Sequence, residues 1–294
     1  MKNMFLAFTA LLLIPTVSYG QSFRALNPQV QQGDVMIFRI APQWQAPAVV
    51  NPAIAIFGKH YLPNKYGYVF VGIDKSIAPG KHTATLVEYG RGVRLSIDYQ
   101  EVEISERIYQ IRKRTPGKPR NSKEVEAIKN AYAKGSPSES YVDSDFTLPL
   151  DKIVIDKDRV VGDVSSPFGG ESHRGVDLIT LDPKTGKHQR PVKAVNSGKV
   201  IFVAKNFSLE GNMVIIDHGS GIFSIYAHLS AVNVKEGQPV KAEQAIALSG
   251  KSGRKTGPHL HFGIRVGDPT DPTKFPVVDP IRFIETMNSY IIGK

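Results

Sequence analysis

The sequence predicts a mostly β protein with two β-rich regions joined by a short helical segment. Short apolar or alternating runs recur between clusters of turn-forming residues, first over residues 34–108 and again over residues 146–284. No long amphipathic helical pattern interrupts either series. The 294 residues, 41% of them hydrophobic and 22% charged, are enough for two folded domains.

The N-terminus, MKNMFLAFTALLLIPTVSYG, predicts a secretory signal peptide over residues 1–20. Lys2 precedes an apolar run at 4–14, and small residues stand where a signal peptidase prefers them. A membrane anchor is the alternative, but the run falls short of the roughly 20 apolar residues that span a bilayer. We expect a mature chain that begins at Gln21, carries no integral membrane segment, and resides in the periplasm or the extracellular cell wall.

The chain contains no cysteine and is basic. The lack of thiols excludes disulfides, thiol catalysis, thiolate metal sites and an acylated lipoprotein cysteine. The formal net charge is +10, and removal of Lys2 with the signal peptide lowers it to +9. This balance favours an anionic partner outside the cytoplasm, and charge alone does not choose among nucleic acid, acidic membranes and the anionic cell wall.

Residues 21–110 are predicted to form a small β-sandwich or barrel-like domain. Its strand candidates are DVMIFRI, AIAIFG, YGYVFVGI, HTATLVEY, VRLSIDY and VEISERIY. Glycine, proline and asparagine separate these runs at the intervals typical of such folds. His60, His82 and Trp44 stand without catalytic neighbours in the sequence, and we interpret them as structural.

Residues 111–145 are predicted to form a basic linker with a short helix. The run IRKRTPGKPR is either a solvated linker or a patch for cell wall or nucleic acid, and the lack of interleaved aromatic residues favours the linker. A helix is expected over 122–134, with Asn121 as its cap and Glu124 completing a capping box. One face of this helix carries Val125, Ile128 and Tyr132.

Residues 146–294 contain the second β-rich region and six of the eight histidines. Its strand candidates are LDKIVI, HRGVDLIT, GKVIFVA, NMVIIDHG, IFSIYAHL, AIALSG and HLHFGIRV. In GPHLHFGIRV, His259 and His261 must share one face of an extended strand, because side chains alternate along it. The pair alone fits either structural histidines or a metal site.

A second motif, SHRGVDLIT, places His173 and Asp177 four residues apart, which brings both to one side of an extended strand. A catalytic zinc site needs three nitrogen or oxygen ligands and an open fourth position. His173, Asp177 and one of the two histidines in HLH supply that set.

A third motif, SIYAHLS, ends an apolar strand with His228. Strict alternation places Ala227 and Leu229 on the face opposite to His228. A lone histidine of this kind is more often structural. Four histidines and an aspartate at three strand ends of one cysteine-free region are better explained by a metal site.

These motifs, SHRGVDL, YAHLS and SGRKTGPHLHFGI in that order, resemble the zinc metallopeptidase family of lysostaphin and the LytM-type peptidoglycan endopeptidases, the M23 peptidases. The resemblance covers about residues 160–284. It implies that the domain at 146–294 is a lysostaphin/LytM-like antiparallel β-sheet peptidase. Residues 21–110 resemble, much more weakly, the β-rich modules that precede such domains in exported bacterial proteins.

The resemblance implies one Zn²⁺ ion held by His173, Asp177 and His261, with His228 and His259 as catalytic residues beside the zinc-bound water. The implied activity is hydrolysis of peptide cross-links in peptidoglycan, with no nucleic acid as a partner. Either the bond from D-alanine to diaminopimelate or a glycine bridge fits, and either histidine could be the base. A non-catalytic module that binds the wall or activates other hydrolases is the alternative, and the complete ligand set argues against it.

The remaining motifs lie outside this predicted zinc site. The segment LDPKTGKHQR is longer than the turn the family more often has, which predicts a long loop where His188 faces solvent or touches substrate. His218, at a turn between strands, is expected to be structural. AIALSGKS is not a nucleotide site, because Ala245 stands in place of the first glycine of a phosphate-binding loop. No G-x-S-x-G surrounds any serine, so a serine hydrolase with a nucleophile elbow has no support.

The domain order also suggests self-inhibition. A segment at 115–144 that mixes proline, glycine and charge permits the N-terminal domain to dock on the active site or to be released from it. In that case a chain shortened to begin near Asp145 hydrolyses the wall faster than the chain from Gln21.

Overall fold

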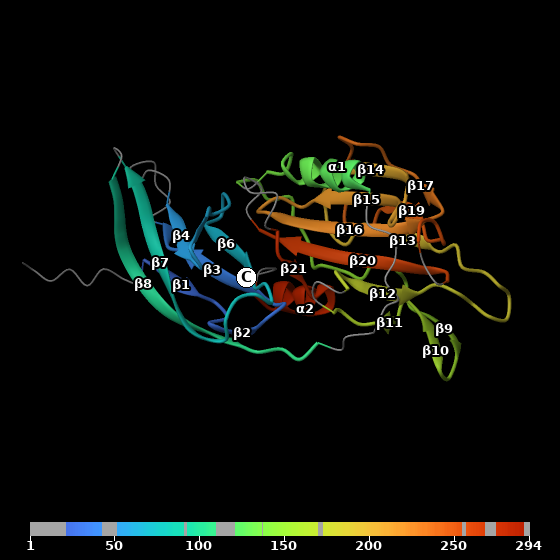
Figure 1. Ribbon diagram of the computed structural model, residues 1–294, viewed down its shortest axis with the longest axis horizontal. Coiled ribbons are helices and arrows are strands. Elements are labelled where there is room, and N and C mark those ends of the chain that lie inside the picture. Colours follow the sequence, from blue (N-terminus) through green and yellow to red (C-terminus); the bar gives the residue numbers. More distant parts are fainter. Residues whose placement is uncertain are drawn as a thin grey trace, which may run out of the picture.

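The computed structural model describes residues 22–42, 52–90, 93–109, 121–136, 138–169, 173–254, 257–267 and 275–290 (Figure 1). The predicted signal peptide at 1–20, Trp44 and the whole basic run at 111–120 lie outside the described residues. Strands dominate both halves of the chain, which confirms the mostly β fold class.

The N-terminal module, residues 22–109 as described, is a sandwich of two sheets. One sheet has the order β1-β3-β6, with β1 (Phe23–Ala25), β3 (Val35–Ile40) and β6 (Tyr68–Gly72). The other has the order β2-β8-β7-β4-β5, with β2 (Gln29–Gln31), β4 (Ala53–Ile56), β5 (Lys59–Tyr61), β7 (Gly80–Gly90) and β8 (Val93–Ser105). Apolar residues of both sheets share one core. The runs VRLSIDY and VEISERIY were predicted as separate strands, but the first run and the first four residues of the second form the single strand β8, which ends at Ser105.

Helix α1 (Ser122–Tyr132) ends two residues earlier than predicted. Its cap is as expected, because Asn121 Oδ1 accepts a hydrogen bond of 3.0 Å from the Lys123 amide. Ile128 and Tyr132 pack on the sheet, whereas Val125 is 40% exposed, so the predicted apolar face is one residue narrower than the pattern indicated.

The C-terminal half is built on an antiparallel sheet of eight described strands (Figure 1). Its order is β11-β12-β20-β16-β15-β14-β18, and β21 pairs with β20. The bounds are β11 (Val164–Ser166), β12 (Val176–Ile179), β14 (Gly198–Phe207), β15 (Gly211–Asp217), β16 (Ile222–Leu229), β18 (Pro239–Val240), β20 (His259–Val266) and β21 (Val277–Val278). Smaller sheets are formed by β13 (Pro191–Lys193), β17 (Ala231–Val232) and β19 (Ala245–Leu248), and by the hairpin of β9 (Ile153–Asp156) and β10 (Arg159–Val161).

The two faces of this sheet have different partners. One face, which carries Tyr226 and Phe262, packs on the main apolar core. The opposite face carries Ile225 and Ala227, and α1 packs against it beside β14 (Figure 1). Since His261 pairs with Ala227 across the strands, the HLH histidines lie on the same face as α1.

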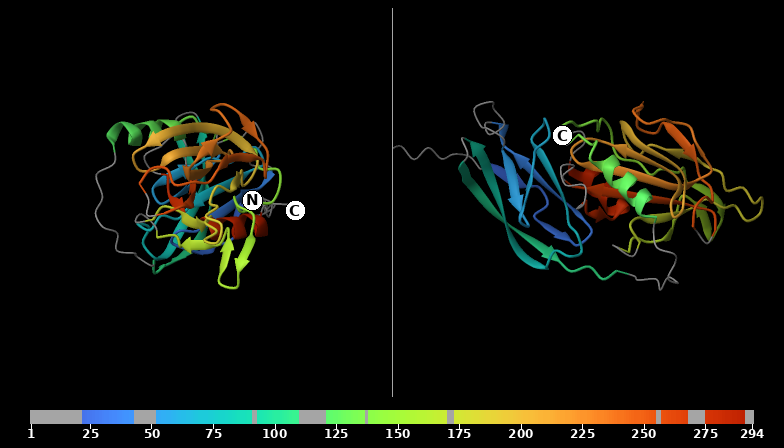
Figure 2. Two further views of the ribbon diagram at one scale, coloured as in Figure 1. Left: turned by 90° about the vertical axis from the view of Figure 1, so that its right-hand side faces the viewer. Right: turned by 45° about the horizontal axis from the view of Figure 1, so that its top comes forward.

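Helix α2 (Pro280–Tyr290) was not predicted from the sequence, which we read as β-rich through residue 284. Asp279 followed by Pro280 is a helix-start signal, since Asp279 Oδ1 accepts the Ile281 amide at 3.0 Å. The helix buries Phe283 and Met287 in the main core. Val35 and Phe70 of the N-terminal module join the same core, so α2 lies between the two halves (Figures 1 and 2).

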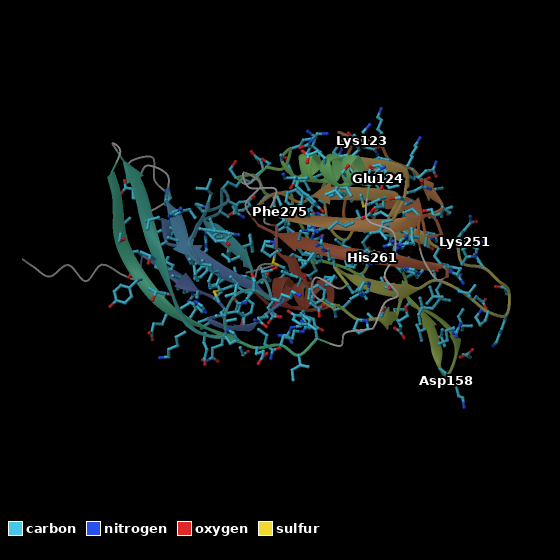
Figure 3. The ribbon with its side chains drawn as sticks, viewed as in Figure 1. Lys123, Glu124, Asp158, Lys251, His261 and Phe275 are labelled. Atoms are coloured by element: carbon cyan, nitrogen blue, oxygen red, sulfur yellow. The ribbon has the colours of Figure 1, made fainter. Side chains whose placement is uncertain are left out.

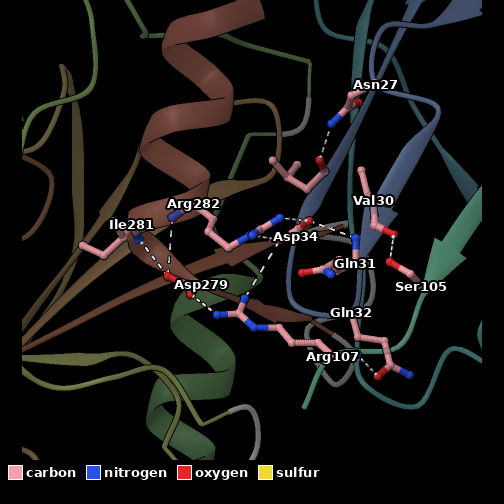
Figure 4. Close-up of polar contacts among 11 residues, drawn as sticks. Asn27, Val30, Gln31, Gln32, Asp34, Ser105, Arg107, Asp279, Ile281 and Arg282 are labelled. Atoms are coloured by element: carbon pink, nitrogen blue, oxygen red, sulfur yellow. Dashed lines mark hydrogen bonds and ion pairs between the residues drawn. The ribbon is translucent and has the colours of Figure 1, made fainter. Parts of the chain in front are cut away.

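Charged side chains fix the N-terminal module to α2 (Figure 4). Asp34 is bound by both Nε and Nη2 of Arg282, at 2.6 and 2.7 Å, and its side chain is only 6% exposed. Arg107 Nη2 lies 2.5 Å from Asp279, whose amide donates to the Gly33 carbonyl at 2.7 Å. This contact belongs to the fold itself, because it joins buried groups from both halves.

The N-terminal module also contacts the end of β20 at Val266. Gly72 of β6 lies so close to this end that a Cβ placed on it would come within 2.8 Å of the Val266 carbonyl. The predicted docking of the N-terminal module on the active site concerns the opposite end of β20, at His259, and it stays a prediction.

Within the described residues, neither helix is long and apolar enough to cross a membrane.

Candidate metal centre

Strand register brings three predicted site residues to one face of the sheet. Strands β12 and β20 pair with Asp177 opposite His261 and Ile179 opposite His259. Residues that pair directly across antiparallel strands share a face, so the Asp177 carboxylate and both imidazoles project together. The alternation argument for the HLH motif is thus confirmed by the strand register. Figure 3 labels His261 on β20.

His173 joins this group from the loop before β12. Its Nδ1 donates to the Pro167 carbonyl at 2.7 Å, which turns Nε2 to within 2.9 Å of Asp177 Oδ1. His261 Nδ1 lies 3.0 Å from the same oxygen. The structure therefore brings together the three predicted ligands, and their ligand atoms all lie within 4.8 Å of one another.

This donor set fits zinc. Two imidazole nitrogens and a carboxylate oxygen are ligands that zinc accepts, and bonds of about 2.0–2.2 Å in a tetrahedron separate ligand atoms by about 3.4 Å. The observed separations of 2.9 and 3.0 Å require only small side-chain movements to reach that value.

Gly175 makes the close approach of these elements feasible. A Cβ at this position would lie 2.3 Å from the Phe262 carbonyl and 2.9 Å from Cε1 of His261. Real Cβ contacts are not that short, so any side chain at Gly175 would push the His173 loop away from β20.

His228 reaches the site through a β-bulge, which corrects the strict alternation expected from sequence. Val214 pairs with Tyr226, but Asn212 pairs with Leu229, so β16 has one extra residue in this interval. His228 has a φ of 62°, in the left-handed region. The bulge turns its ring away from the core face of Tyr226 and toward the HLH histidines, as bulges near active sites often do.

The second pair of imidazoles is oriented by backbone carbonyls. His228 Nδ1 donates to the Ser252 carbonyl at 2.9 Å, and His259 Nδ1 donates to the Gly257 carbonyl at 2.9 Å. The His228 ring centroid lies 4.8 Å from that of His259 and 6.1 Å from that of His261. His259 Nε2 lies 3.7 Å from Asp177 Oδ1, so both rings border the predicted ligand cluster.

Burial and hydrogen bonding keep Asp177 ionised and keep His228 and His261 neutral. Burial alone would raise the pKa of Asp177, but hydrogen bonds and charge interactions with His173 and His261 outweigh it and hold this pKa well below its usual value. Burial lowers the pKa of His261, and it lowers that of His228 to about 4, with nearby His259 and His261 adding to the effect. An ionised carboxylate beside neutral imidazoles is the state in which such side chains bind a metal.

The carbonyls of Pro167, Ser252 and Gly257 were missed by sequence reasoning, since a backbone oxygen leaves no signal in residue type. Two other histidines lie apart from the cluster. His188 is half-buried, with Nδ1 3.1 Å from the Gly186 carbonyl. His218 is fully buried and bonds to the Ser197 carbonyl and to Ser224 Oγ, each at 2.8 Å, which agrees with its expected structural role.

Comparisons with known proteins agree with this arrangement. Residues 171–272 match peptidase family M23. Over 103 residues, 35% of this chain and 22% of the relative, the sequence is 47% identical to the peptidoglycan DD-endopeptidase ShyB of Vibrio cholerae. It is 37% identical to lysostaphin of Staphylococcus simulans over 123 residues, 41% of this chain and 23% of the relative. The matched part of the chain thus spans about a quarter of the length of these relatives.

A solved structure matches most of the chain. The crystal structure of a Pseudomonas aeruginosa protein assigned to peptidase M23 is 25% identical, with a TM-score of 0.58, and the match covers 86% of this chain and 94% of the other. A match of this extent includes residues of the N-terminal module as well as the sheet that carries the histidines. The family match at residues 171–272 and the likeness in fold together show that this chain contains a domain of peptidase family M23.

Proposed function

We propose that this protein is an exported, zinc-dependent endopeptidase that hydrolyses peptide cross-links of bacterial peptidoglycan. The observation that carries the proposal is the cluster of His173, Asp177 and His261, whose ligand atoms lie within 4.8 Å of one another beside two further imidazoles. The matched relatives include proteins named as peptidoglycan DD-endopeptidases, which supports the substrate class.

The predicted zinc ligands are Nε2 of His173, Nδ1 of His261 and the carboxylate of Asp177. These are the atoms that already face one another in the cluster. Zinc, when bound, supplies Lewis acidity toward an amide carbonyl and an attacking water.

His228 and His259 are proposed to move protons. Each ring has Nδ1 bonded to a backbone carbonyl, which leaves Nε2 of the neutral ring as an acceptor toward the cluster. One Nε2 accepts the proton of the attacking water and returns it to the amide nitrogen that leaves. The other ring takes a proton at Nε2 from bulk water before the reaction, and this N–H donates to the oxygen on which negative charge develops. Either histidine suits either task.

The net charge supports an anionic polymer as the substrate. The chain carries 37 lysines and arginines against 27 aspartates and glutamates. The cell wall of bacteria offers anionic groups throughout, and a basic protein outside the cytoplasm is drawn to them over long range. Export itself rests on the predicted signal peptide at 1–20.

The predicted docking of the N-terminal module on the site has its own test. If the module blocks the site, a folded, zinc-loaded chain that begins near Asp145 cleaves the wall faster than the chain from Gln21. The two bonds between buried Asp34 and Arg282 instead favour a module held at α2, for which the shortened chain is equally active or slower.

The proposed function is tested by measuring bound zinc and the turbidity of purified sacculi together. We expect about one zinc per chain and a fall in turbidity that stops with a chelator and returns with added zinc. A zinc-loaded, folded protein that leaves sacculi unchanged would instead support the non-catalytic module that binds wall or activates other hydrolases.

A further inference from the structure

We infer that Glu124, on the helix before the peptidase sheet, is a positioning residue for His228, so that α1 is part of the catalytic unit and not of a linker. The catalytic consequence rests on the proposed function, in which His228 moves a proton. The placement of His228 by α1 is a separate structural claim that can be measured without hydrolysis.

Helix α1 is held firmly on the sheet near its C-terminus. Tyr132 is 4% exposed, and its ring centroid lies 5.2 Å from that of Phe223 and 5.1 Å from that of Phe275. The guanidinium of Arg265 lies 5.4 Å from the Tyr132 centroid, and Ile128 packs against the same core one turn earlier. These contacts fix where the first turn of the helix lies.

In that first turn, Glu124 bonds to the β14–β15 turn, whereas the capping-box pattern predicted a bond within its own helix. Figure 3 labels Glu124 on α1. Glu124 Oε1 accepts the Ser208 amide at 2.9 Å, and Oε2 accepts the Ser208 hydroxyl at 2.5 Å. Both oxygens are engaged by one residue, and a carboxylate strengthens each bond relative to a neutral acceptor.

The β14–β15 turn, to which Glu124 is bonded, also binds the backbone of His228. The Glu210 carbonyl accepts the backbone amide of His228 at 2.9 Å. The Leu209 carbonyl accepts the amide of Arg254 at 3.0 Å, which ties the turn to the segment that includes Ser252. The backbone of His228 and the loop beside it are therefore bonded to residues directly after Ser208.

Ser252 completes the connection to the ring. Its hydroxyl accepts the Asn212 amide at 2.9 Å and donates to the Leu229 carbonyl at 2.7 Å, while its own carbonyl accepts His228 Nδ1. A Cβ on Gly211 would lie 2.2 Å from Ser252 Oγ, so the turn and the loop are in direct contact. Both the backbone and the ring of His228 thus depend on the segment 208–212.

His228 needs such support because its φ of 62° is unfavourable for a residue with a Cβ. Conformations of this kind persist only where the surrounding structure holds them. Glu124 supplies the contact that reaches this turn from α1, so weakening it loosens the bulge and the direction of the His228 ring.

The test compares Glu124→Gln with Glu126→Gln in the full chain. The first change leaves a single acceptor oxygen for Ser208, whereas Glu126 is exposed on the same helix and gives a matched loss of charge. We expect roughly three- to tenfold faster hydrogen exchange at the His228 amide in Glu124→Gln only. We also expect kcat to fall by a similar factor, with KM and zinc content unchanged.

Ser208→Ala provides a second route to the same contact. The double variant Glu124→Gln/Ser208→Ala should exchange the His228 amide little faster than either single variant, because both changes weaken the same contact between Glu124 and Ser208. Exchange at the His228 amide that equals that of the wild type, an equal effect of Glu126→Gln, or an unchanged kcat in an active enzyme would overturn the inference. If the wild type cleaves no substrate, the proposed function fails, and the exchange comparison alone decides the positioning role.

Discussion

At the scale of single residues, backbone carbonyls decide how the imidazoles present themselves. In three of the four rings at the site, Nδ1 donates to a backbone carbonyl: to Pro167 from His173, to Ser252 from His228 and to Gly257 from His259. This selects Nε2 as the atom that faces the site. His261 is the exception, since its Nδ1 faces Asp177. The chemistry of the site therefore depends on loop backbone as much as on histidine content.

Alanine substitutions should separate the proposed zinc ligands from the histidines proposed to transfer protons. His173→Ala, Asp177→Ala and His261→Ala are each expected to abolish zinc binding and hydrolysis, because each removes one of three ligands. His228→Ala and His259→Ala should retain zinc and lose about 10²- to 10⁴-fold in kcat. Zinc content by elemental analysis and initial rates check both sets.

The two members of HLH give the sharpest comparison. Retention of zinc by His261→Ala together with its loss in His259→Ala would reverse their assignment. The shared face of the two rings would survive that outcome, since it follows from the pairing of Asp177 with His261.

Buried His218 should make stability depend on pH. Burial lowers its pKa from 6.5 to about 4, so between these values the unfolded chain binds a proton that the folded chain does not. Its contribution to stability is complete above pH 6.5 and is lost as pH falls toward 4. The neighbouring Asp217 acts oppositely, because burial raises its pKa to about 6 and its contribution is lost as pH rises through that value.

His218→Asn isolates the histidine, since the Asn amide can still donate to the Ser197 carbonyl. Between pH 7 and pH 5, we expect urea unfolding to show a smaller loss of stability in the variant, by on the order of 2 kcal/mol. Parallel pH profiles for the two proteins would show that His218 is protonated equally in the folded and unfolded states.

At the scale of elements, the close approach of the His173 loop to β20 is the feature on which the cluster depends. Gly175 permits it, and the bulge at His228 brings a fourth ring to the same place from β16. Both features are local departures from regular strand geometry, placed beside the site.

Gly175→Ala should therefore weaken zinc binding as well as stability. Its new methyl group would overlap the Phe262 carbonyl, so the loop must shift away from His261. We expect a lower melting temperature and at least tenfold weaker zinc affinity. Gly257→Ala is the control, because a Cβ there meets no atom within 4 Å. Equal zinc affinity in Gly175→Ala and the wild type would show that the loop position does not govern the site.

Regular elements were predictable and irregular ones were not. Strand β20 coincides with the run HLHFGIRV, because period-two alternation and β-branched content act over the whole stretch. The bulge at His228 has no such pattern, so alternation placed its ring on the wrong face. Helix α2 was missed because its eleven residues follow a strand-rich region, and only Asp279 with Pro280 marks its start.

At the scale of the whole molecule, the two halves share a core and an ionic contact. Phe70 of the N-terminal module and Phe283 of α2 belong to one apolar cluster. Asp34 is nearly buried between Arg282 and Arg107, with the latter at 4.0 Å. This construction favours a module that stabilises the peptidase domain.

Asp34→Ala should test this reading of the interface. The change leaves Arg282 without its carboxylate, whereas Arg107 keeps Asp279 as a partner. Because the Arg282 side chain is 43% exposed and stays hydrated, we expect a loss of about 2 kcal/mol, less than the cost of breaking a fully buried pair. Glu101→Ala removes an exposed partner of Lys81 and should change the free energy of unfolding by less than about 1 kcal/mol. A stability loss in Asp34→Ala no larger than in Glu101→Ala would mean that the two halves are held mainly by their apolar contacts.

The proposed endopeptidase activity is tested most directly by treating defined, cross-linked muropeptide dimers with the zinc-loaded protein and measuring the masses of the products. The proposed chemistry predicts chelator-sensitive conversion of each dimer into two peptides whose summed mass exceeds that of the dimer by one water, with glycan bonds intact. His228→Ala with full zinc content should convert dimers far more slowly. Intact dimers after treatment with a folded, zinc-loaded wild type, or products cut only in the glycan, would contradict a peptidoglycan endopeptidase.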